Sequence, residues 1–325
     1  VYKCQNPTCS LYKSNLKKLS KQQKKEYKIN PSKFTLHYIT RIFDGSIKQL
    51  ENFTKTVRAS KVELRNIRAN RHTLGLILTY YINYGLSLRK TALILREVHD
   101  IKISHQTVAN YAEAVSHLIE PWLDNYQYDC LSKDHCGDET YVKVKGKHAY
   151  VFFMCDSVSK IITSFNIFMK RDTFSAIQTF YSVIRKFKAI PEGFNIVVDG
   201  NPIYKAAQQY FQLNGINFDI HQVIGLKNQD ETSKKHRPAK QIIERLNRTF
   251  QFSYYVKNGF STVDKANEFM YLFTTYFNFL RNHKSLGYKP PIELNRFKDE
   301  VNMPKKWNMI IDMAYDYDIE QDMQF

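Results

Sequence analysis

The sequence is short of the features that mark secreted and membrane proteins. Its 325 residues include only five cysteines, an odd number that does not supply a secreted disulfide framework. The first residues are polar and do not form a signal peptide. The longest apolar run, Phe269 to Leu280, is interrupted by Thr and Asn and is too short to cross a bilayer. These absences predict a protein of a reducing, cytoplasmic compartment with no membrane partner.

Acidic residues are scarce at the beginning of the chain. Residues 1–75 carry 17 Lys and Arg but only 4 Asp and Glu, so +13 of the total net charge of +17 lies in the first quarter. A basic arm on a nearly neutral body is common in proteins that bind a nucleic-acid backbone. The alternative, a basic surface that serves only solubility, would spread the charge more evenly. The remaining composition, 43% hydrophobic and 14% aromatic, supports a packed core and two or three domains.

Two thiols near the start, Cys4 and Cys9, flank an Asn-Pro turn. This arrangement suits half of a structural zinc site, which needs four ligands. No second close pair of cysteines follows nearby, so the alternative is a zinc ribbon whose other pair precedes Val1. We expect residues 1–73 to form a basic arm with a partial zinc knuckle.

Residues 74–121 have the pattern of a helix-turn-helix. Leu74 to Tyr84 reads as a helix that ends at Gly85, Ser87 begins a second helix, and Ser104 is a candidate N-cap for a third. We expect the third helix to enter the major groove of DNA, although many helix pairs bind nothing. The side chains near its exposed start that are candidates for base contacts are His105, Gln106, Asn110 and Thr107. Pro121 predicts the end of this region.

From residue 136 the hydrophobic period changes from that of helices to that of strands. The predicted strands are 140–145, 148–156, 161–169, 194–198 and 218–223. The predicted helices are 172–187, 203–213, one that begins at Pro238 after a polar stretch, and an aromatic helix at 263–282. This order predicts an α/β fold with a mixed five-stranded sheet and flanking helices. The acidic tail, 307–325, is expected to pack loosely or to bind elsewhere.

Two aspartates are candidate metal ligands. Asp138 shares a strand face with Thr140, Val142 and Val144, where a carboxylate is costly unless it is paired or bound to metal. Asp199 follows a buried strand, at the end where open α/β sheets place their ligands. Each alone is more often a turn former or cap. Together they predict neighbouring carboxylates that hold Mg²⁺ or Mn²⁺ for phosphoryl transfer.

Glu244 is a candidate third carboxylate. Ile242, Leu246 and Phe250 mark the core side of its helix, and Glu244 points roughly the other way. Lys240, four residues earlier, lies on the same stripe of the helix, as does Arg248. By itself this pattern is equally that of a solvated face with ion pairs four residues apart.

Four stretches in this order resemble the ribonuclease H-like catalytic core of insertion-sequence transposases of the DDE type and of retroviral-type integrases. They are Asp138–Lys147, Ile196–Tyr204, Gln241–Phe250 and Tyr276–Gly287, the last followed by Pro290 and Pro291. The resemblance covers about residues 136–293, and the front end resembles the DNA-binding region of such transposases. Asp199 and Glu244 are 45 residues apart, farther than in many members, which implies an insertion within 224–238.

The resemblance implies a DNA transposase. Asp138, Asp199 and Glu244 would hold two Mg²⁺ or Mn²⁺ ions, water would free a 3′-hydroxyl at the element's end, and that hydroxyl would attack target DNA. The expected partners are double-stranded DNA of terminal repeats and target, in a homodimer or larger synaptic assembly associated with the nucleoid. The candidates for phosphate positioning are Lys143, Lys145, Lys147, Lys240, Arg245 and Arg248.

The corresponding domains are the arm at 1–73, a helix-turn-helix at 74–121, a ribonuclease H-like catalytic domain at 136–293 and an acidic tail at 294–325. Two other functions remain open at this point. One is a catalytically silent, transposase-derived DNA-binding regulator. The other is a ribonuclease H-like nuclease that does not join strands.

Overall fold

The computed structural model describes residues 17, 19–30, 47, 50, 60, 62–129, 131–223 and 231–323. The chain divides into two compact units, Val1–Gly45 and Ser46–Phe325. In the first unit, helix α2 (Lys21–Ile29) is exposed and begins at a capping box between Ser20 and Gln23. Cys4 and Cys9 lie outside the described residues. Among the described residues, no helix has both the length and the apolar character that a membrane crossing requires.

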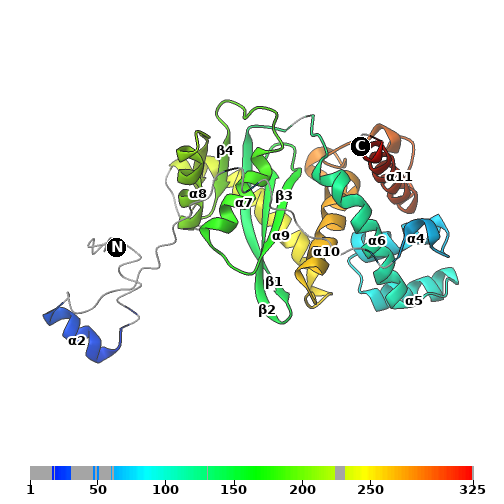
Figure 1. Cartoon of the computed structure of the whole chain (residues 1–325), viewed down its shortest axis with the longest axis horizontal. Coiled ribbons are helices and arrows are strands. Elements are labelled where there is room, and N and C mark those ends of the chain that lie inside the picture. The colour runs from blue at the N-terminus through cyan, green and yellow to red at the C-terminus, as the bar shows by residue number, and fades with distance from the viewer. Residues whose placement is uncertain are drawn as a thin grey trace. The chain divides into compact units, whose positions relative to one another are not determined.

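The second unit contains a five-stranded mixed sheet in the order β3-β2-β1-β4-β5 (Figure 1). Strands β1 (Asp134–Val144), β2 (Lys147–Asp156) and β3 (Ile162–Phe168) form an antiparallel meander. Strands β4 (Asn195–Val198) and β5 (Asp219–Gln222) continue the sheet in parallel with β1. The mixed five-stranded sheet predicted from the sequence is confirmed.

The β1–β2 hairpin closes with two residues, Lys145 and Gly146, at φ of 51° and 73°. Two successive positive φ values match the twist of the flanking strands, and glycine adopts such a φ without a steric cost. These two residues therefore form the tight turn between the first two predicted strands. Strand β1 begins six residues before the predicted start at Thr140, which places Asp138 in the middle of the strand.

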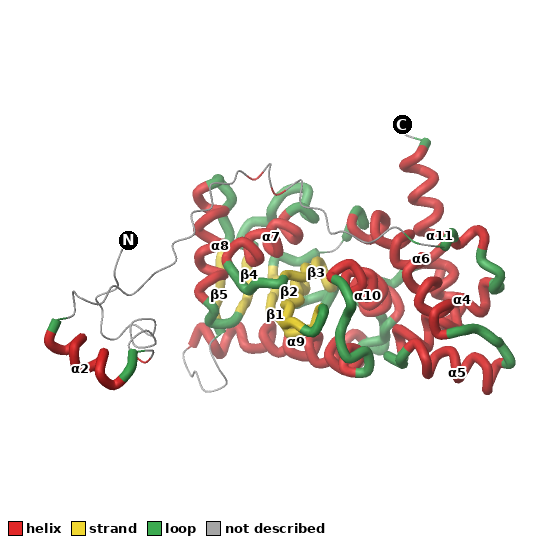
Figure 2. The backbone as a smooth tube through the Cα atoms, turned by 60° about the horizontal axis from the view of Figure 1, so that its bottom comes forward, coloured by secondary structure: helices red, strands yellow, loops and turns green. Residues whose placement is uncertain are grey.

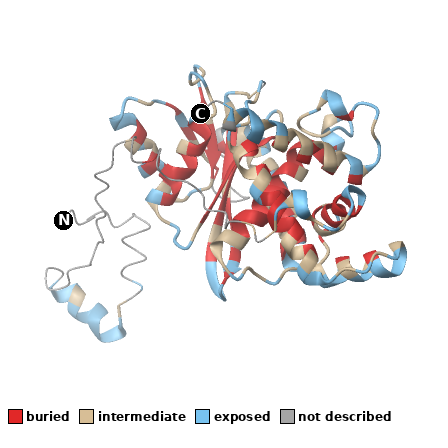
Figure 3. Cartoon of the chain, turned by 45° about the vertical axis from the view of Figure 1, so that its right-hand side comes forward, coloured by how far each residue is buried: buried red, intermediate tan, exposed pale blue. Residues whose placement is uncertain are grey.

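Helices cover both faces of the sheet (Figure 2). On one face, α7 (Thr173–Ile184) and α8 (Pro202–Leu213) form a core with residues of β2, β4 and β5. On the other face, α9 (Glu231–Tyr255) and α10 (Val263–Thr275) pack on β1, β2 and β3. Figure 3 shows the buried residues concentrated in the sheet and in the inner sides of these helices. The predicted start of α9 at Pro238 is wrong, because residues 231–237 are already helical.

Residues 71–124 are mainly helical. They form α4 (Arg71–Leu78), a π-helical turn (Thr79–Asn83), α5 (Leu88–His99) and α6 (His105–Asp124). Ser104 caps α6, as predicted, through a hydrogen bond from the Thr107 N–H to its hydroxyl. The predicted boundary at Pro121 is wrong, since α6 continues through it to Asp124.

This helical region packs on the rest of the second unit. The Ser116 hydroxyl of α6 donates to the Glu268 carbonyl of α10 at 3.0 Å. The last helix, α11 (Met303–Asp322), buries Trp307 against α4, and the indole N–H donates to Asn83 at 3.0 Å. Gly75 of α4 allows this approach, because a Cβ there would stand 2.3 Å from the Pro304 carbonyl oxygen. The expectation of a loosely packed tail is therefore wrong for most of α11.

Candidate metal centre and its surroundings

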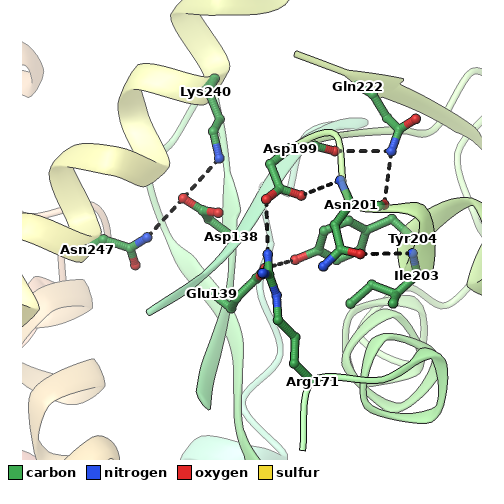
Figure 4. Close-up of polar contacts among 10 residues, drawn as sticks. All are labelled: Asp138, Glu139, Arg171, Asp199, Asn201, Ile203, Tyr204, Gln222, Lys240 and Asn247. Carbon is green, nitrogen blue, oxygen red and sulfur yellow. Dashed lines mark hydrogen bonds and ion pairs between the residues drawn. The ribbon is translucent and has the colours of Figure 1, made fainter. Parts of the chain in front are cut away.

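Asp138 lies at the centre of β1 and faces α9, on the same side as Val142 and Val144, as predicted. Its Oδ2 accepts hydrogen bonds from the Lys240 Nζ at 2.9 Å and from the Asn247 Nδ2 at 3.1 Å (Figure 4). Its side chain is 15% exposed, and that of Lys240 is 11% exposed. The carboxylate is thus held by two donors from a single helix.

The pKa of Asp138 is raised above its ordinary value. Burial is the largest cause, because removal from water disfavours the charged form. Lys240 opposes this shift through its charge and its hydrogen bond, while the negative charges of Asp199 and Glu244 raise the pKa further. Asp138 is therefore the residue at which the three predicted carboxylates interact electrostatically.

Asp199 follows β4 directly. Cys136 of β1 pairs with Val197 of β4 in parallel, so the next pair of positions on each strand places Asp138 beside Asp199. Asp199 Oδ1 accepts from the Asn201 N–H at 2.9 Å, which makes the tight turn expected of an Asp after a strand. The amide of Gln222, at the end of β5, donates to the carbonyls of Asp199 and Asn201 at 3.2 and 3.0 Å. The turn is thereby fixed from both sides.

Glu139 is a third carboxylate at this site that the sequence reasoning missed. It is buried, makes an ion pair with Arg171, and accepts a hydrogen bond from the Tyr204 hydroxyl of α8. Arg171 also contacts Asp199 at 3.2 Å and so links the two carboxylates (Figure 4). The pKa of Tyr204 is well above its ordinary value, first because of burial and then because of nearby carboxylates that include Asp199. In the sequence, Glu139 is marked only by its place next to Asp138 in the strand.

Oxygen atoms of Asp138, Glu139 and Asp199 all lie within 4.8 Å of one another, close enough to bind one ion. Carboxylate oxygens are the ligands that Mg²⁺ and other hard divalent cations prefer. The raised pKa of Asp138, caused in part by negative neighbours, also fits a site that gains from a cation. The donor set therefore suits a divalent metal.

Glu244 is half-buried on α9 and is not a member of this close group. It stands four residues after Lys240 and three before Asn247, which places the three on one stripe of the helix. Because Lys240 and Asn247 both contact Asp138, this stripe faces β1 rather than open solvent. Arg248 is exposed.

The other predicted site residues lie apart from this cluster. Lys143, Lys145 and Lys147 are exposed at the β1–β2 hairpin. At about 3.3 Å per residue, even Lys143 is roughly 16 Å along β1 from Asp138. Arg245 is exposed on α9, while Lys240 is the one phosphate-positioning candidate that contacts Asp138 among the described residues.

The first residues of α6 line a cavity in the second unit. Gln106 Nε2 donates to Asn110 Oδ1 at 2.8 Å, and His105 beside them is exposed. These three side chains line this cavity of about 490 Å³, whose wall also includes Val256, Lys257, Gly259, Phe260, Ser261 and Lys265. The start of the predicted recognition helix is accessible, and one side of it faces this cavity.

Residues 133–269 match the model of a protein family described as a DDE domain. The chain is also 26% identical over 145 residues to the transposase for insertion sequence-like element IS431mec of Staphylococcus aureus strain N315. The transposase for insertion sequence element IS257 in transposon Tn4003 of Staphylococcus aureus matches with the same identity and length. Each match covers 42% of this chain and 59% of the relative, so the chain spans only part of the length of these relatives.

Two solved structures are also similar. One is the HTLV-2 integrase catalytic core domain in complex with magnesium, with 16% identity, a TM-score of 0.35, and coverage of 50% of this chain and 97% of that chain. The other is the Mos1 strand transfer complex, with 11% identity, a TM-score of 0.34, and coverage of 79% and 81%. The family match and the staphylococcal relatives confirm the resemblance that the sequence motifs indicated.

Proposed function

We propose that this chain cuts and joins DNA with two divalent ions, because residues 133–269 match a family described as a DDE domain and the chain is similar to insertion-sequence transposases. The ions, Mg²⁺ or Mn²⁺, are held by Asp138, Asp199 and Glu244. The observation that carries this proposal is the position of Asp138, whose pKa is raised in part by the charges of both other carboxylates. Asp138 of β1 and Asp199, directly after β4, lie side by side, and Glu244 is on the stripe of α9 that faces β1, which supports this assignment.

The reaction occurs in two steps. Divalent ions held by Asp138, Asp199 and Glu244 would supply the activation of the attacking oxygen and the stabilisation of the leaving 3′-oxygen. In the first step, water attacks the phosphate at the element's end, the bond to the 3′-oxygen breaks, and a 3′-hydroxyl is released. In the second step, this hydroxyl attacks a phosphate of target DNA and displaces its 3′-oxygen. Neither step needs a covalent intermediate on the protein.

The surrounding side chains position the carboxylates. Lys240 and Asn247 hold one oxygen of Asp138 and leave the other carboxylate oxygen for a ligand. Arg171 joins Glu139 to Asp199 and sets the distance between β1 and the turn after β4. We assign Glu139 to this supporting role, since Arg171 and Tyr204 already engage its carboxylate.

Double-stranded DNA is the proposed partner, as terminal repeats and as target. The net charge of +17 supports a polyanionic partner. Because two ends must be cut and joined together, the proposal includes a homodimer or a larger assembly, associated with the nucleoid. The helices α5 and α6, joined by residues 100–104, are assigned to the recognition of the ends.

Incubation of the full chain with duplexes that carry its element's ends, a target plasmid and Mg²⁺ tests the proposal. Sequencing of the products should reveal 3′ ends cut at the element boundary and strands joined to the target, and EDTA should abolish both. Glu244→Gln serves as the matched inactive control. Cut strands without joined products would identify a nuclease, and specific binding without cutting would identify a regulator; either result contradicts the proposal.

A further inference from the structure

The side of α9 that points away from Asp138 borders a second cavity, of about 540 Å³. At 100° per residue, Arg245 and Thr249 stand on the opposite side of the helix from Lys240 and Asn247. Lys160, in the turn between β2 and β3, also lines the cavity, and its apolar lining includes Ile242, Leu246 and Phe277, with Cys155 of β2. The polar residues that the segment after α10 contributes are Arg281, Asn282, His283, Lys284 and Ser285.

This cavity has a strong excess of positive charge. Its wall includes Lys160, Arg245, Arg281 and Lys284 but no Asp or Glu. Within the described ranges, none of these four cations makes an ion pair. This sets them apart from Lys240 and Arg171 at the acidic site, whose charges are balanced by carboxylates.

The internal contacts of the cavity hold the cations in place without neutralising them. Lys160 Nζ donates to the Ser285 hydroxyl at 2.6 Å. The Arg281 guanidinium lies 5.5 Å from the centre of the Phe277 ring and contacts the His283 imidazole at 3.1 Å. Burial, and then the positive charge of Arg281, lower the pKa of His283 to about 4, as expected where no anion compensates.

We propose that this cavity binds a phosphodiester group of DNA, as a second, sequence-independent contact on the back of the helix that carries Glu244. Guanidinium and ammonium groups bind phosphate oxygens strongly, and guanidinium does so in a bidentate manner. Hydroxyl and amide donors, here Ser285 and Asn282, are also common phosphate contacts. Arg245 and Lys284 are exposed, so the site is open to a polymer and not only to a small ion.

The DNA assignment rests on the proposed function, whereas the anion site itself does not. A helix with its side chains is about 10 Å across, so a phosphate bound in this cavity is not the scissile phosphate held at Asp138. It belongs either to a distant part of the same duplex or to a second duplex. The cavity thus orients DNA relative to α9 and takes no part in the chemical step.

The test is a comparison of two charge-matched double variants of the full chain. One is Arg245→Gln with Lys284→Gln; the control is Lys188→Gln with Lys298→Gln, two exposed lysines that line none of the cavities described above. Binding to a duplex of random sequence is measured by fluorescence anisotropy in EDTA at several salt concentrations. The cavity variant should bind more weakly, and its plot of log K against log salt should be shallower by about 0.9 for each phosphate that it no longer binds.

Several results would overturn the inference. One such result is a slope of log K against log salt that is the same for the cavity variant and the unchanged chain. Another is a control variant whose slope is lowered by as much as that of the cavity variant. Calorimetry with inorganic phosphate and with a poly-glutamate peptide identifies other sources of the anion: if the cavity variant fails to bind these but still binds DNA normally, DNA is excluded as the ligand. If the double variant does not give the circular dichroism of the folded chain, Lys160→Gln replaces it. Since no metal is present, a failure of the catalytic proposal leaves this measurement unaffected.

Discussion

The Lys240 ammonium of α9 lies 2.9 Å from Oδ2 of Asp138 at the centre of β1, and both side chains are largely buried. This ion pair holds the helix that carries Glu244 against the strand that carries Asp138. It also supplies positive charge where the charges of Asp199 and Glu244 would otherwise be unopposed at Asp138. Lys240 therefore supplies part of the positive charge that a bound cation would bring to Asp138.

Replacement of Lys240 by Met should lower the stability of the metal-free chain and increase its response to metal. Loss of one partner of a buried pair costs on the order of 3 kcal/mol. Mn²⁺ should then raise the Tm of Lys240→Met more than that of the unchanged chain, because the ion replaces the lost charge. Thermal unfolding with and without Mn²⁺ measures both effects, with Lys234→Met, at an exposed position of α9, as the control. Equal Mn²⁺ shifts in all three proteins would disprove this role.

The roles of Glu139 and Glu244 can be separated with isosteric variants. Glu244→Gln should abolish cleavage with little loss of stability, because a half-buried carboxylate on the helix surface loses only its charge. Asp138→Asn and Asp199→Asn should also abolish cleavage, and all three should still bind DNA. Glu139→Gln should cut DNA but unfold at a lower temperature, because it weakens the ion pair with Arg171. The reverse pattern, with cutting abolished in Glu139→Gln and kept in Glu244→Gln, would make Glu139 the third metal ligand.

The sequence was sufficient for the number and order of the strands but not for the full extent of β1 and α9. Alternating apolar residues after Thr140 predict β1, whereas residues 134–137 include no such alternation and carry no strand signal of their own. The first turns of α9 are polar on all sides, so no period marks them as helix before Pro238. In both cases the tertiary packing extends an element beyond its local signal.

The same distinction applies to the site. The proximity of Asp138 and Asp199 could be predicted, because Asp138 shares a strand face with Val142 and Val144, and Asp199 follows an apolar strand. Glu139 looks like the ordinary outward partner of Asp138, since only the fold brings Arg171 and Tyr204 to it, from positions 32 and 65 residues later in the chain. A contact between distant segments leaves no periodic trace in a single sequence, so these supporting residues could not be predicted.

Sequence-specific binding to the element ends should depend on the first residues of α6. Gln106→Ala with Asn110→Ala removes two amides that can bind an adenine edge, so discrimination between element ends and random DNA should fall by roughly 1–3 kcal/mol for each base that is no longer read. Binding is titrated on both DNAs at equal salt, with His117→Ala, an exposed position later on α6, as the control. Unchanged discrimination would mean that α6 is a scaffold and that another segment reads the sequence.

Removal of residues 1–45 should affect all DNA alike. This unit carries 10 basic and 2 acidic residues, whereas Val62, Leu64 and Ile67 pack on the core of the second unit and must be kept. The truncated chain should bind element ends and random DNA more weakly by the same factor, with a shallower dependence on salt. Titrations of both DNAs at several salt concentrations provide the check. A selective loss for the element ends would instead place sequence recognition in this unit.

The Nζ of Lys257 is buried in the wall of the cavity beside α6 and has no hydrogen-bond partner among the described residues. The ammonium lies 4.1 Å from the centre of the Tyr81 ring and 4.4 Å from that of Phe269. Burial lowers the pKa of Lys257 from its ordinary 10.5 to about 7. Between these two pH values the unfolded chain binds one proton more than the folded chain, so stability must fall as the pH is lowered through this window.

Lys257→Met should remove this dependence. The free energy of unfolding of the unchanged chain should fall by up to about 1.4 kcal/mol per pH unit between pH 10 and 7 relative to the variant, and the difference should become constant below pH 7. Urea unfolding at four pH values measures this difference, and Lys188→Met, at an exposed site, should follow the unchanged chain. Parallel pH profiles for Lys257→Met and the unchanged chain would show that Lys257 remains charged in the folded protein. In that case its contacts with Tyr81 and Phe269 would be sufficient to retain the charge despite burial.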